Sequence, residues 1–205
     1  MAGMKRILIL GDRAAAHWHP ITGIDEELVR ILSGYEAAVT EDYKGMKYED
    51  LRGYDAVVNY VDAWDAAGAG FAGALIAYAA AGGAVLTIHS GVIARNLPEI
   101  PQLVGAAFTG HPEHETLEYV PVGEHPLAKG GFAIDEEPYQ FELSNLAKRD
   151  VFMEYLYKGG RYPAAWTRSF GAGKLCYLSM GHNLASFQSE GFGALIRAAA
   201  AWCVG

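Results

Sequence analysis

The chain has 205 residues, of which 51% are hydrophobic, and it carries a formal net charge of −8 at pH 7. This composition is typical of a folded globular protein and excludes collagen-like, coiled-coil and disordered chains. The acidic balance argues against binding to nucleic acid or to an anionic membrane surface.

Strands and helices alternate through the first half of the chain. Short apolar runs that end in turn residues predict strands at residues 5–10, 35–40, 54–61 and 84–88. Helices are predicted at residues 22–33, with Thr22 as the capping residue, and at residues 70–81, which end at two glycines. This alternation predicts a doubly wound α/β sheet with mostly parallel strands.

The second half of the chain has a different pattern, with few predicted helices. Residues 115–180 contain strand-like pieces separated by turns, and strands at 166–170 and 174–180 flank a glycine-bearing hairpin loop. A helix is predicted over residues 186–204. With no internal repeat or linker, we expect one domain over residues 1–205, an α/β sheet with an antiparallel β extension.

The cysteines and the first strand bear on where the protein resides. Cys176 and Cys203 form no C-x-x-C pair, so we expect reduced thiols. The apolar run at residues 7–10 is too short for a signal-peptide core, and no continuous apolar stretch of about 20 residues predicts a membrane span. We therefore expect a cytoplasmic protein.

A histidine follows the fourth predicted strand in the setting of a nucleophile elbow. Such a strained turn needs small residues two positions before and after its apex. With His89 at the apex these are Thr87 and Gly91, whereas with Ser90 both are bulky and branched. We expect His89 at the carboxyl edge of the sheet, where open α/β folds bind ligands. A histidine that is merely hydrogen-bonded at a strand end is the alternative.

Other histidines also follow strands. His17 and His19 come after the first strand and His182 after the last, so strand-end loops could bring them together with His89. Imidazoles serve both as acid–base groups and as metal ligands. The sequence requires no cofactor, but a divalent metal is compatible with it, with candidate ligands His17, His19 and His111; for His111 a solvated loop is the alternative.

An acidic segment, residues 135–137, precedes Tyr139. Adjacent carboxylates repel, so Glu136 or Glu137 is expected to have a raised pKa and to act as an acid or base. A solvated acidic turn ahead of a strand is the alternative.

Taken together, several of these segments resemble the ThuA-like (trehalose utilisation) family of the class I glutamine amidotransferase-like superfamily. The resemblance implies a flavodoxin-like sheet, a site at its carboxyl edge and a link to carbohydrate metabolism. The matching segments are residues 82–90, 108–112, 125–127, 131–132, 136–139, 166–168, 171–174, Tyr177, Ser179, residues 181–182 and residues 201–202.

Two features qualify the resemblance. The amidotransferase relatives have a cysteine at the elbow apex, where this chain has His89, so we expect no glutaminase activity. The family's Asp-Glu-x-Tyr signature is present with glutamate in its first position, so Glu137 and Tyr139 carry over. His182 falls where the superfamily's catalytic histidine follows its last strand.

The leading hypothesis is an enzyme that acts on a small sugar-like molecule by hydrolysis, elimination or isomerisation. His89, Glu137 and His182 would supply acid–base chemistry. The alternative is a non-catalytic module that binds or senses such a ligand. We expect no nucleic-acid or membrane partner, and a homo-oligomer is compatible with the sequence. The expected substrate-binding residues are His17, His19, Trp18, Ser90, His111 and Tyr139, with Trp64 as a further aromatic face.

Overall fold

The computed structural model describes residues 3–62, 69–93 and 97–205, so Trp64 lies outside the described residues. The strands are β1 (Arg6–Leu10), β2 (Glu36–Thr40), β3 (Ala56–Asn59), β4 (Ala84–Ile88), β5 (Ala106–Gly110), β6 (Glu115–Pro121), β7 (Phe132–Glu136), β8 (Gln140–Leu143), β9 (Asp150–Tyr157), β10 (Gly160–Phe170) and β11 (Gly173–Leu178). The helices are α1 (Ile24–Ile31), α2 (Tyr48–Leu51), α3 (Ala69–Ala80), α4 (Glu99–Val104), α5 (Leu184–Gln188) and α6 (Glu190–Val204), with a 3₁₀ turn η1 (His89–Val92).

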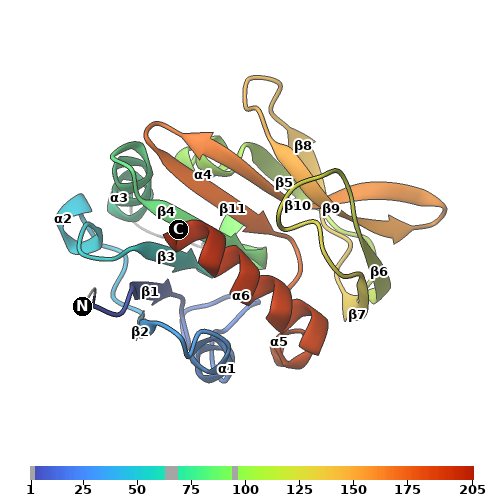
Figure 1. The fold of residues 1–205 in the computed structure, drawn as a ribbon, viewed down its shortest axis with the longest axis horizontal. Helices are drawn as coiled ribbons and strands as arrows, with labels where there is room; N and C mark the ends of the chain where they lie inside the picture. The colour runs from blue at the N-terminus through green and yellow to red at the C-terminus, as the bar shows by residue number, and fades with distance from the viewer. Residues whose placement is uncertain (1–2, 63–68, 94–96) are drawn as a thin grey trace.

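One continuous sheet joins the two halves of the chain (Figure 1). Its strand order is β2-β1-β3-β4-β11-β10-β9-β6-β7, with β5 and β8 paired separately. The first five strands are parallel and follow the flavodoxin-like order, with β11 in the fifth position. From β11 onward each neighbouring pair is antiparallel. The predicted doubly wound sheet and its antiparallel extension are confirmed.

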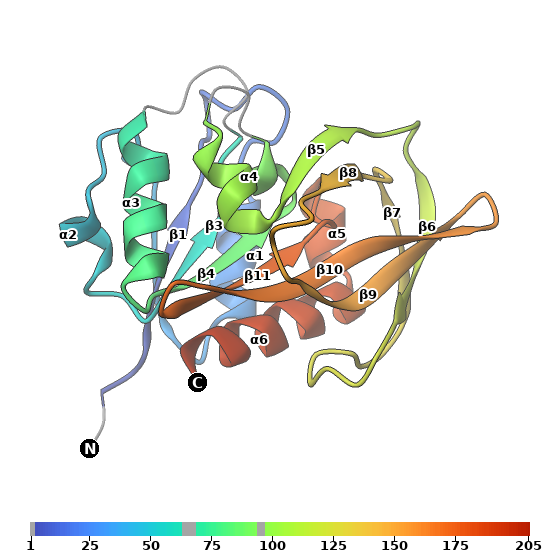
Figure 2. The same cartoon turned by 90° about the horizontal axis from the view of Figure 1, so that it is seen from above.

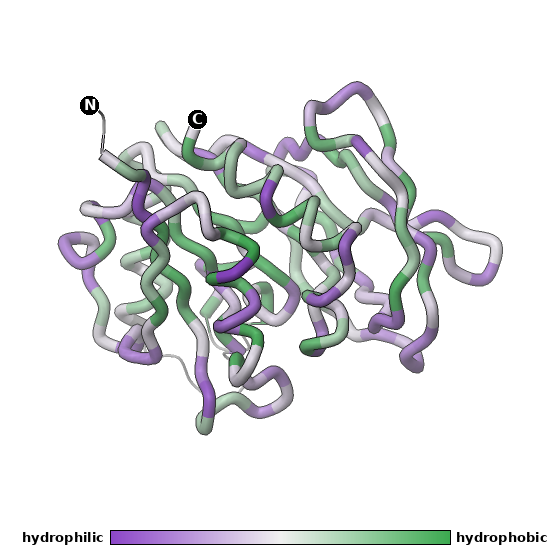
Figure 3. Tube along the Cα trace, turned by 60° about the horizontal axis from the view of Figure 1, so that its bottom comes forward, coloured by the Kyte–Doolittle hydropathy of each residue, from purple (hydrophilic) through white to green (hydrophobic). Residues whose placement is uncertain are grey.

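Helices cover both faces of the parallel strands (Figure 2). Successive residues of β1 point to opposite faces, so Ile7 and Ile9 join one hydrophobic cluster with α1, α5 and α6, while Leu8 and Leu10 join the other with α3 and α4. Figure 3 shows the hydrophobic residues concentrated along the central strands and the hydrophilic ones in the outer turns. Burial on both faces explains why these strands are continuous apolar runs in the sequence.

Two helix predictions need correction. Thr22 does not cap α1: Gly23 is the N-cap, with φ 78°, and no side chain caps this end. The predicted C-terminal helix is two helices, because Ser189 has an extended backbone with ψ 128° between α5 and α6. The Asn183 side chain caps α5 by accepting a hydrogen bond from the Ser186 amide. The short helices α2 and α4 have no counterpart in the sequence predictions.

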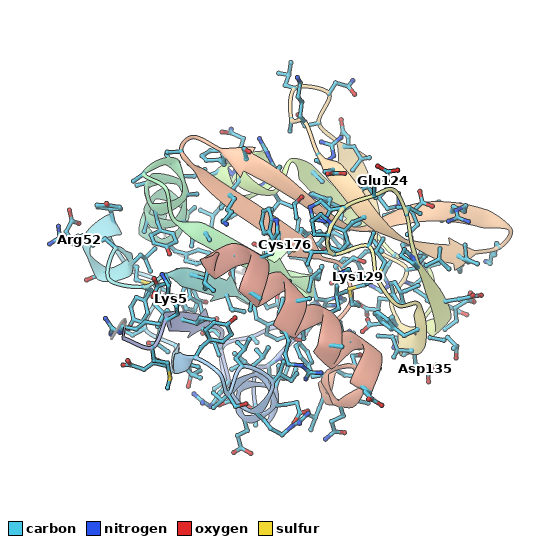
Figure 4. All side chains as sticks on the ribbon, viewed as in Figure 1. Lys5, Arg52, Glu124, Lys129, Asp135 and Cys176 are labelled. Atoms are coloured by element: carbon cyan, nitrogen blue, oxygen red, sulfur yellow. The ribbon has the colours of Figure 1, made fainter. Side chains whose placement is uncertain are left out.

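Both cysteines are buried as free thiols. Burial raises the pKa of the Cys203 thiol to about 12 and that of Cys176 well above its ordinary value. Figure 4 places Cys176 in the middle of the sheet, whereas Arg52 lies at the end of α2, on the outside of the molecule. These thiols are therefore inert packing groups. Among the described helices, none has the length and apolar character needed to cross a membrane.

His125 holds the loop between β6 and β7. Its Nδ1 accepts the Leu127 amide at 3.1 Å, which leaves Nε2–H to donate to Thr167 Oγ1 at 3.0 Å. Its ring stacks on Phe152 at 5.1 Å. Burial lowers the pKa of His125, because a protonated ring is desolvated and cannot accept at Nδ1.

The stability should therefore depend on His125 below neutral pH. Because the pKa is lowered in the folded state, the stability is fully present above the ordinary value of 6.5 and is lost as the pH falls through it. Urea unfolding between about pH 7.5 and 5.5 measures this loss. His125→Gln should show a shallower pH dependence, and the exposed His114→Gln should keep the wild-type slope. Equal slopes in all three proteins would contradict the assignment.

Candidate functional site

Three parallel strands deliver the histidines of the candidate site. His19 lies in the loop after β1, His89 directly follows β4, and His182 follows β11. Because the carboxyl ends of parallel strands share one edge, these residues meet although they are far apart in sequence. Glu137 directly follows β7, in the antiparallel part of the sheet. The structure thus brings His89, Glu137 and His182 together, with His19 as a fourth member.

His89 lies at the apex of a strained turn. Its φ is 43°, in the left-handed region that non-glycine residues rarely adopt. A Cβ on Gly91 would lie 2.3 Å from the Asn59 carbonyl oxygen, so only glycine fits after this apex. The His89 ring is fully buried, and its Nδ1 donates to the Ser179 carbonyl at 2.6 Å. Burial lowers the pKa of His89, which keeps the imidazole neutral.

Asp62 orients His19. Its Oδ2 accepts the backbone N–H groups of Trp18 at 2.7 Å and His19 at 3.0 Å, and lies 3.2 Å from His19 Nδ1. Burial opposes the charge on His19, but hydrogen bonds that its ring donates to the Asp62 and Glu137 carboxylates outweigh this and raise its pKa. Sequence reasoning missed Asp62. The strand-end rule could have found it, because it closely follows β3.

Glu137 lies at the centre of the imidazoles. Its Oε2 is 3.3 Å from His89 Nε2, 3.2 Å from His182 Nδ1 and 3.7 Å from His19 Nε2, and its Oε1 is 3.5 Å from His111 Nε2. Burial alone would raise the pKa of Glu137, but the surrounding imidazoles outweigh it and lower the value. The expected rise from carboxylate repulsion is therefore wrong for Glu137, because its environment is set by imidazoles.

The neighbouring Glu136 has a different task. It is fully buried, and its Oε1 accepts the backbone N–H groups of Gly181 at 2.7 Å and His182 at 3.1 Å. It therefore ties the end of β7 to the loop after β11 and positions His182. The two adjacent carboxylates thus have different roles: Glu136 holds the backbone, and Glu137 faces the imidazoles.

A pocket opens above the cluster, with a volume of about 480 Å³, within the range of small-molecule sites. Tyr139 and Phe108 form an aromatic wall, with ring centroids 4.3 Å apart. Trp18 is 62% exposed at the rim. The lining residues are Trp18, His19, Ile93, Phe108, His111, Glu137, Tyr139 and His182.

Several expected residues take other positions. Ser90 is buried, and its hydroxyl donates to the Tyr60 carbonyl at 3.2 Å instead of lining the pocket. His17 is exposed, with its ring against Trp18. Phe108 and Ile93 line the pocket but were not expected there, because apolar residues carry no chemical signal in the sequence.

Four side chains could hold a metal ion. The ligand atoms of His19, His89, Glu137 and His182 all lie within 4.8 Å of one another. Of the three expected metal candidates only His19 belongs to this group. His111 instead faces the other carboxylate oxygen of Glu137, Oε1.

Glu136 provides a test of the backbone anchor. Glu136→Ala removes the acceptor of two N–H groups in the loop after β11, and should lower the free energy of unfolding by about 1–3 kcal/mol. Urea denaturation measures this, and Glu118→Ala, at an exposed position of β6, should change it by less than about 0.5 kcal/mol. An equal effect of both substitutions would show that the anchor does not contribute.

Comparison with known proteins identifies similar chains. The sequence profile of the family described as "ThuA: Trehalose utilisation" matches residues 6–203. A comparison with curated proteins found no match.

Solved structures are similar over nearly the whole chain. A ThuA-like protein from Bacteroides uniformis is 19% identical, with a TM-score of 0.79 over 100% of this chain and 94% of that one. A ThuA-like protein from Parabacteroides merdae is 16% identical, with a TM-score of 0.79 over 98% and 90%. A β-galactosidase from Rahnella sp. R3 is 13% identical, with a TM-score of 0.68 over 98% of this chain but 32% of that one. At such identities the likeness establishes the fold alone.

Proposed function

The chain belongs to the trehalose-utilisation (ThuA) family, and we propose that it is an enzyme that transforms a small sugar-like molecule by proton transfer at the His/Glu cluster. The observation that carries this proposal is the position of Glu137, which lies among imidazoles and also lines the pocket. A carboxylate and imidazoles that meet in a pocket are the groups of general acid–base catalysis.

The pocket has the chemistry of a sugar site. Trp18, Phe108 and Tyr139 offer aromatic surface to the apolar face of a sugar ring, while Glu137 and the histidines offer hydrogen-bond partners to its hydroxyls. The description of the family as trehalose utilisation supports the same substrate class.

The proton-transfer roles follow from the surroundings of each group. The imidazoles lower the pKa of Glu137 and keep it ionised, so it stabilises positive charge on a neighbouring imidazole and accepts hydrogen bonds. His182 is 28% exposed, lines the pocket and lies 3.2 Å from Glu137, so it exchanges a proton with a bound molecule beside this carboxylate. Buried His89 lies behind them, with its Nε2 3.3 Å from Glu137 Oε2.

Substitution of the cluster tests this function. Purified protein is incubated with a panel of monosaccharides, disaccharides including trehalose, and their keto derivatives, and product formation is followed by mass spectrometry. Glu137→Gln and His182→Ala should each lower kcat by about 10²–10⁴-fold, as expected for loss of a general acid or base. Glu118→Ala, at an exposed position of β6 and outside the pocket lining, should retain wild-type turnover.

Turnover that persists in Glu137→Gln, His89→Ala and His182→Ala would overturn the acid–base assignment. Binding of a panel member without turnover in the wild-type protein would instead show a non-catalytic sensing module.

Glutamine should not be hydrolysed. The elbow apex is an imidazole, and both thiols are buried with raised pKa values, so no thiolate can attack the amide. Ammonia release from glutamine, measured by a coupled dehydrogenase assay, should equal the rate without protein. Release that is lost in Cys176→Ser would contradict this expectation.

A further inference from the structure

We propose that His19, His89, His182 and Glu137 form a binding site for a divalent transition-metal ion of the Zn²⁺ class. The inference concerns the cluster itself and does not depend on which molecule enters the pocket. It rests on which nitrogen of each ring carries the hydrogen, on the distances between the ligand atoms and on the groups that orient the rings.

The hydrogen bonds fix which nitrogen carries the proton in two of the rings. His89 Nδ1 lies 2.6 Å from the Ser179 carbonyl, which can only accept, so this nitrogen carries the hydrogen. His19 Nδ1 lies 3.2 Å from the Asp62 carboxylate, which likewise accepts. In the neutral rings both Nε2 atoms therefore present lone pairs, and they face each other at 3.2 Å.

A carboxylate oxygen lies beside these two lone pairs. Glu137 Oε2 is 3.3 Å from His89 Nε2 and 3.7 Å from His19 Nε2. His182 Nδ1 lies 3.2 Å from the same oxygen, so several possible ligand atoms converge on one point. Acceptors that face one another repel unless a proton or a metal ion lies between them, and a bound metal ion would take the place of that proton.

The distances match the edges of a coordination tetrahedron. With Zn–N and Zn–O bonds of about 2.0–2.2 Å, the ligand atoms of a tetrahedral site lie about 3.3–3.6 Å apart. Four of the six separations, 3.2, 3.2, 3.3 and 3.7 Å, lie close to this range, and the other two are within 4.8 Å. Small side-chain adjustments would suffice to close the site around an ion.

Two of the converging atoms are poorly satisfied. Glu137 Oε2 and His182 Nδ1 are both inaccessible to solvent, and neither makes a well-aligned hydrogen bond among the described residues although they lie 3.2 Å apart. Buried polar atoms are normally paired, so their orphaned state indicates a missing partner. A metal ion would satisfy both.

The groups behind the rings have the form seen around metal sites. Metal-binding histidines usually donate their second ring N–H to a carboxylate or a backbone carbonyl, which fixes the tautomer and the ring orientation. Asp62 does this for His19, and the Ser179 carbonyl does it for His89. Asp62 is itself held by two backbone N–H groups.

The ligand types select the class of ion. Three imidazoles and one carboxylate suit Zn²⁺ and its first-row neighbours, whereas Mg²⁺ and Ca²⁺ prefer oxygen ligands throughout. His19, Glu137 and His182 also line the pocket, so the ion would lie at its floor. The histidines would then be ligands, and proton transfer would fall to Glu137 Oε1 and His111, which lie 3.5 Å apart.

Metal titration tests the site. The full chain is produced without a histidine tag, treated with a chelator and titrated with Zn²⁺ by calorimetry and with Co²⁺ by visible absorption. We expect about one equivalent of either ion, an intense Co²⁺ spectrum typical of four-coordination, and a raised melting temperature with Zn²⁺.

Three variants and a control locate the site. His182→Ala and Glu137→Gln should weaken Zn²⁺ binding by at least about tenfold, and Asp62→Asn, which alters the group that orients His19, by about 10–100-fold. His17→Ala, outside the four-residue group, should bind as the wild type does. Circular dichroism verifies that each variant is folded, and His182→Gln replaces His182→Ala if that variant is not.

Wild-type protein that takes up less than about 0.1 equivalents, or folded His182 and Glu137 variants that bind as tightly as the wild type, would overturn the proposal. Metal uptake without turnover of any sugar would support the metal site and contradict the proposed enzymatic function. Turnover by protein that binds no ion would contradict the metal site and support the enzymatic function.

Discussion

The hydrogen bond from His89 Nδ1 to the Ser179 carbonyl joins the ends of two parallel strands that are far apart in the sequence. β4 and β11 are neighbouring parallel strands, so the bond spans the end of one strand and the turn after the next. It fixes the ring at the apex of a strained turn and directs Nε2 toward Glu137. The ring is fully buried and stacks on Tyr139, with the ring centroids 4.1 Å apart, so the other groups are arranged around a well-packed imidazole.

The two halves of the sheet make different contributions to the cluster. The parallel strands end in histidines, which burial favours in the neutral form, as at His89. The antiparallel strands bring Glu136 and Glu137, one to hold the loop after β11 and the other to face the imidazoles. Neither half holds the complete set, so the cluster forms only when β6 and β7 have joined the sheet through β9 and β10.

Much of this arrangement could be predicted from the sequence, because it follows from strand ends. The apolar runs locate the parallel strands, and the rule that their carboxyl ends converge brings His19, His89 and His182 together. The small residues Thr87 and Gly91 identify His89 as the apex. The direction of a side chain within a loop has no such signal, and so Ser90 was expected to contact substrate although its hydroxyl is bonded to the Tyr60 carbonyl.

Other features depend on long-range contacts that no local pattern encodes. The lowered pKa of Glu137 comes from histidines more than 40 residues away, whereas the sequence offered only the adjacent Glu136 as a neighbour. The break in the last helix at Ser189 likewise has no proline as a marker, and the nearby glycines Gly191 and Gly193 lie inside α6. Nothing in the sequence around Asp62 distinguishes it from other polar residues that follow a strand. Its importance arises from its contact with the His19 ring.

The placement of Glu137 on the antiparallel arm has a consequence for how the pocket can diversify. Its negative charge lies at the end of β7, an antiparallel strand that is not inserted between the parallel strands. A substitution of Glu137 alone would change the charge of the pocket floor, while Glu136 kept the loop of His182 in place. The same scaffold could thereby host centres of different charge.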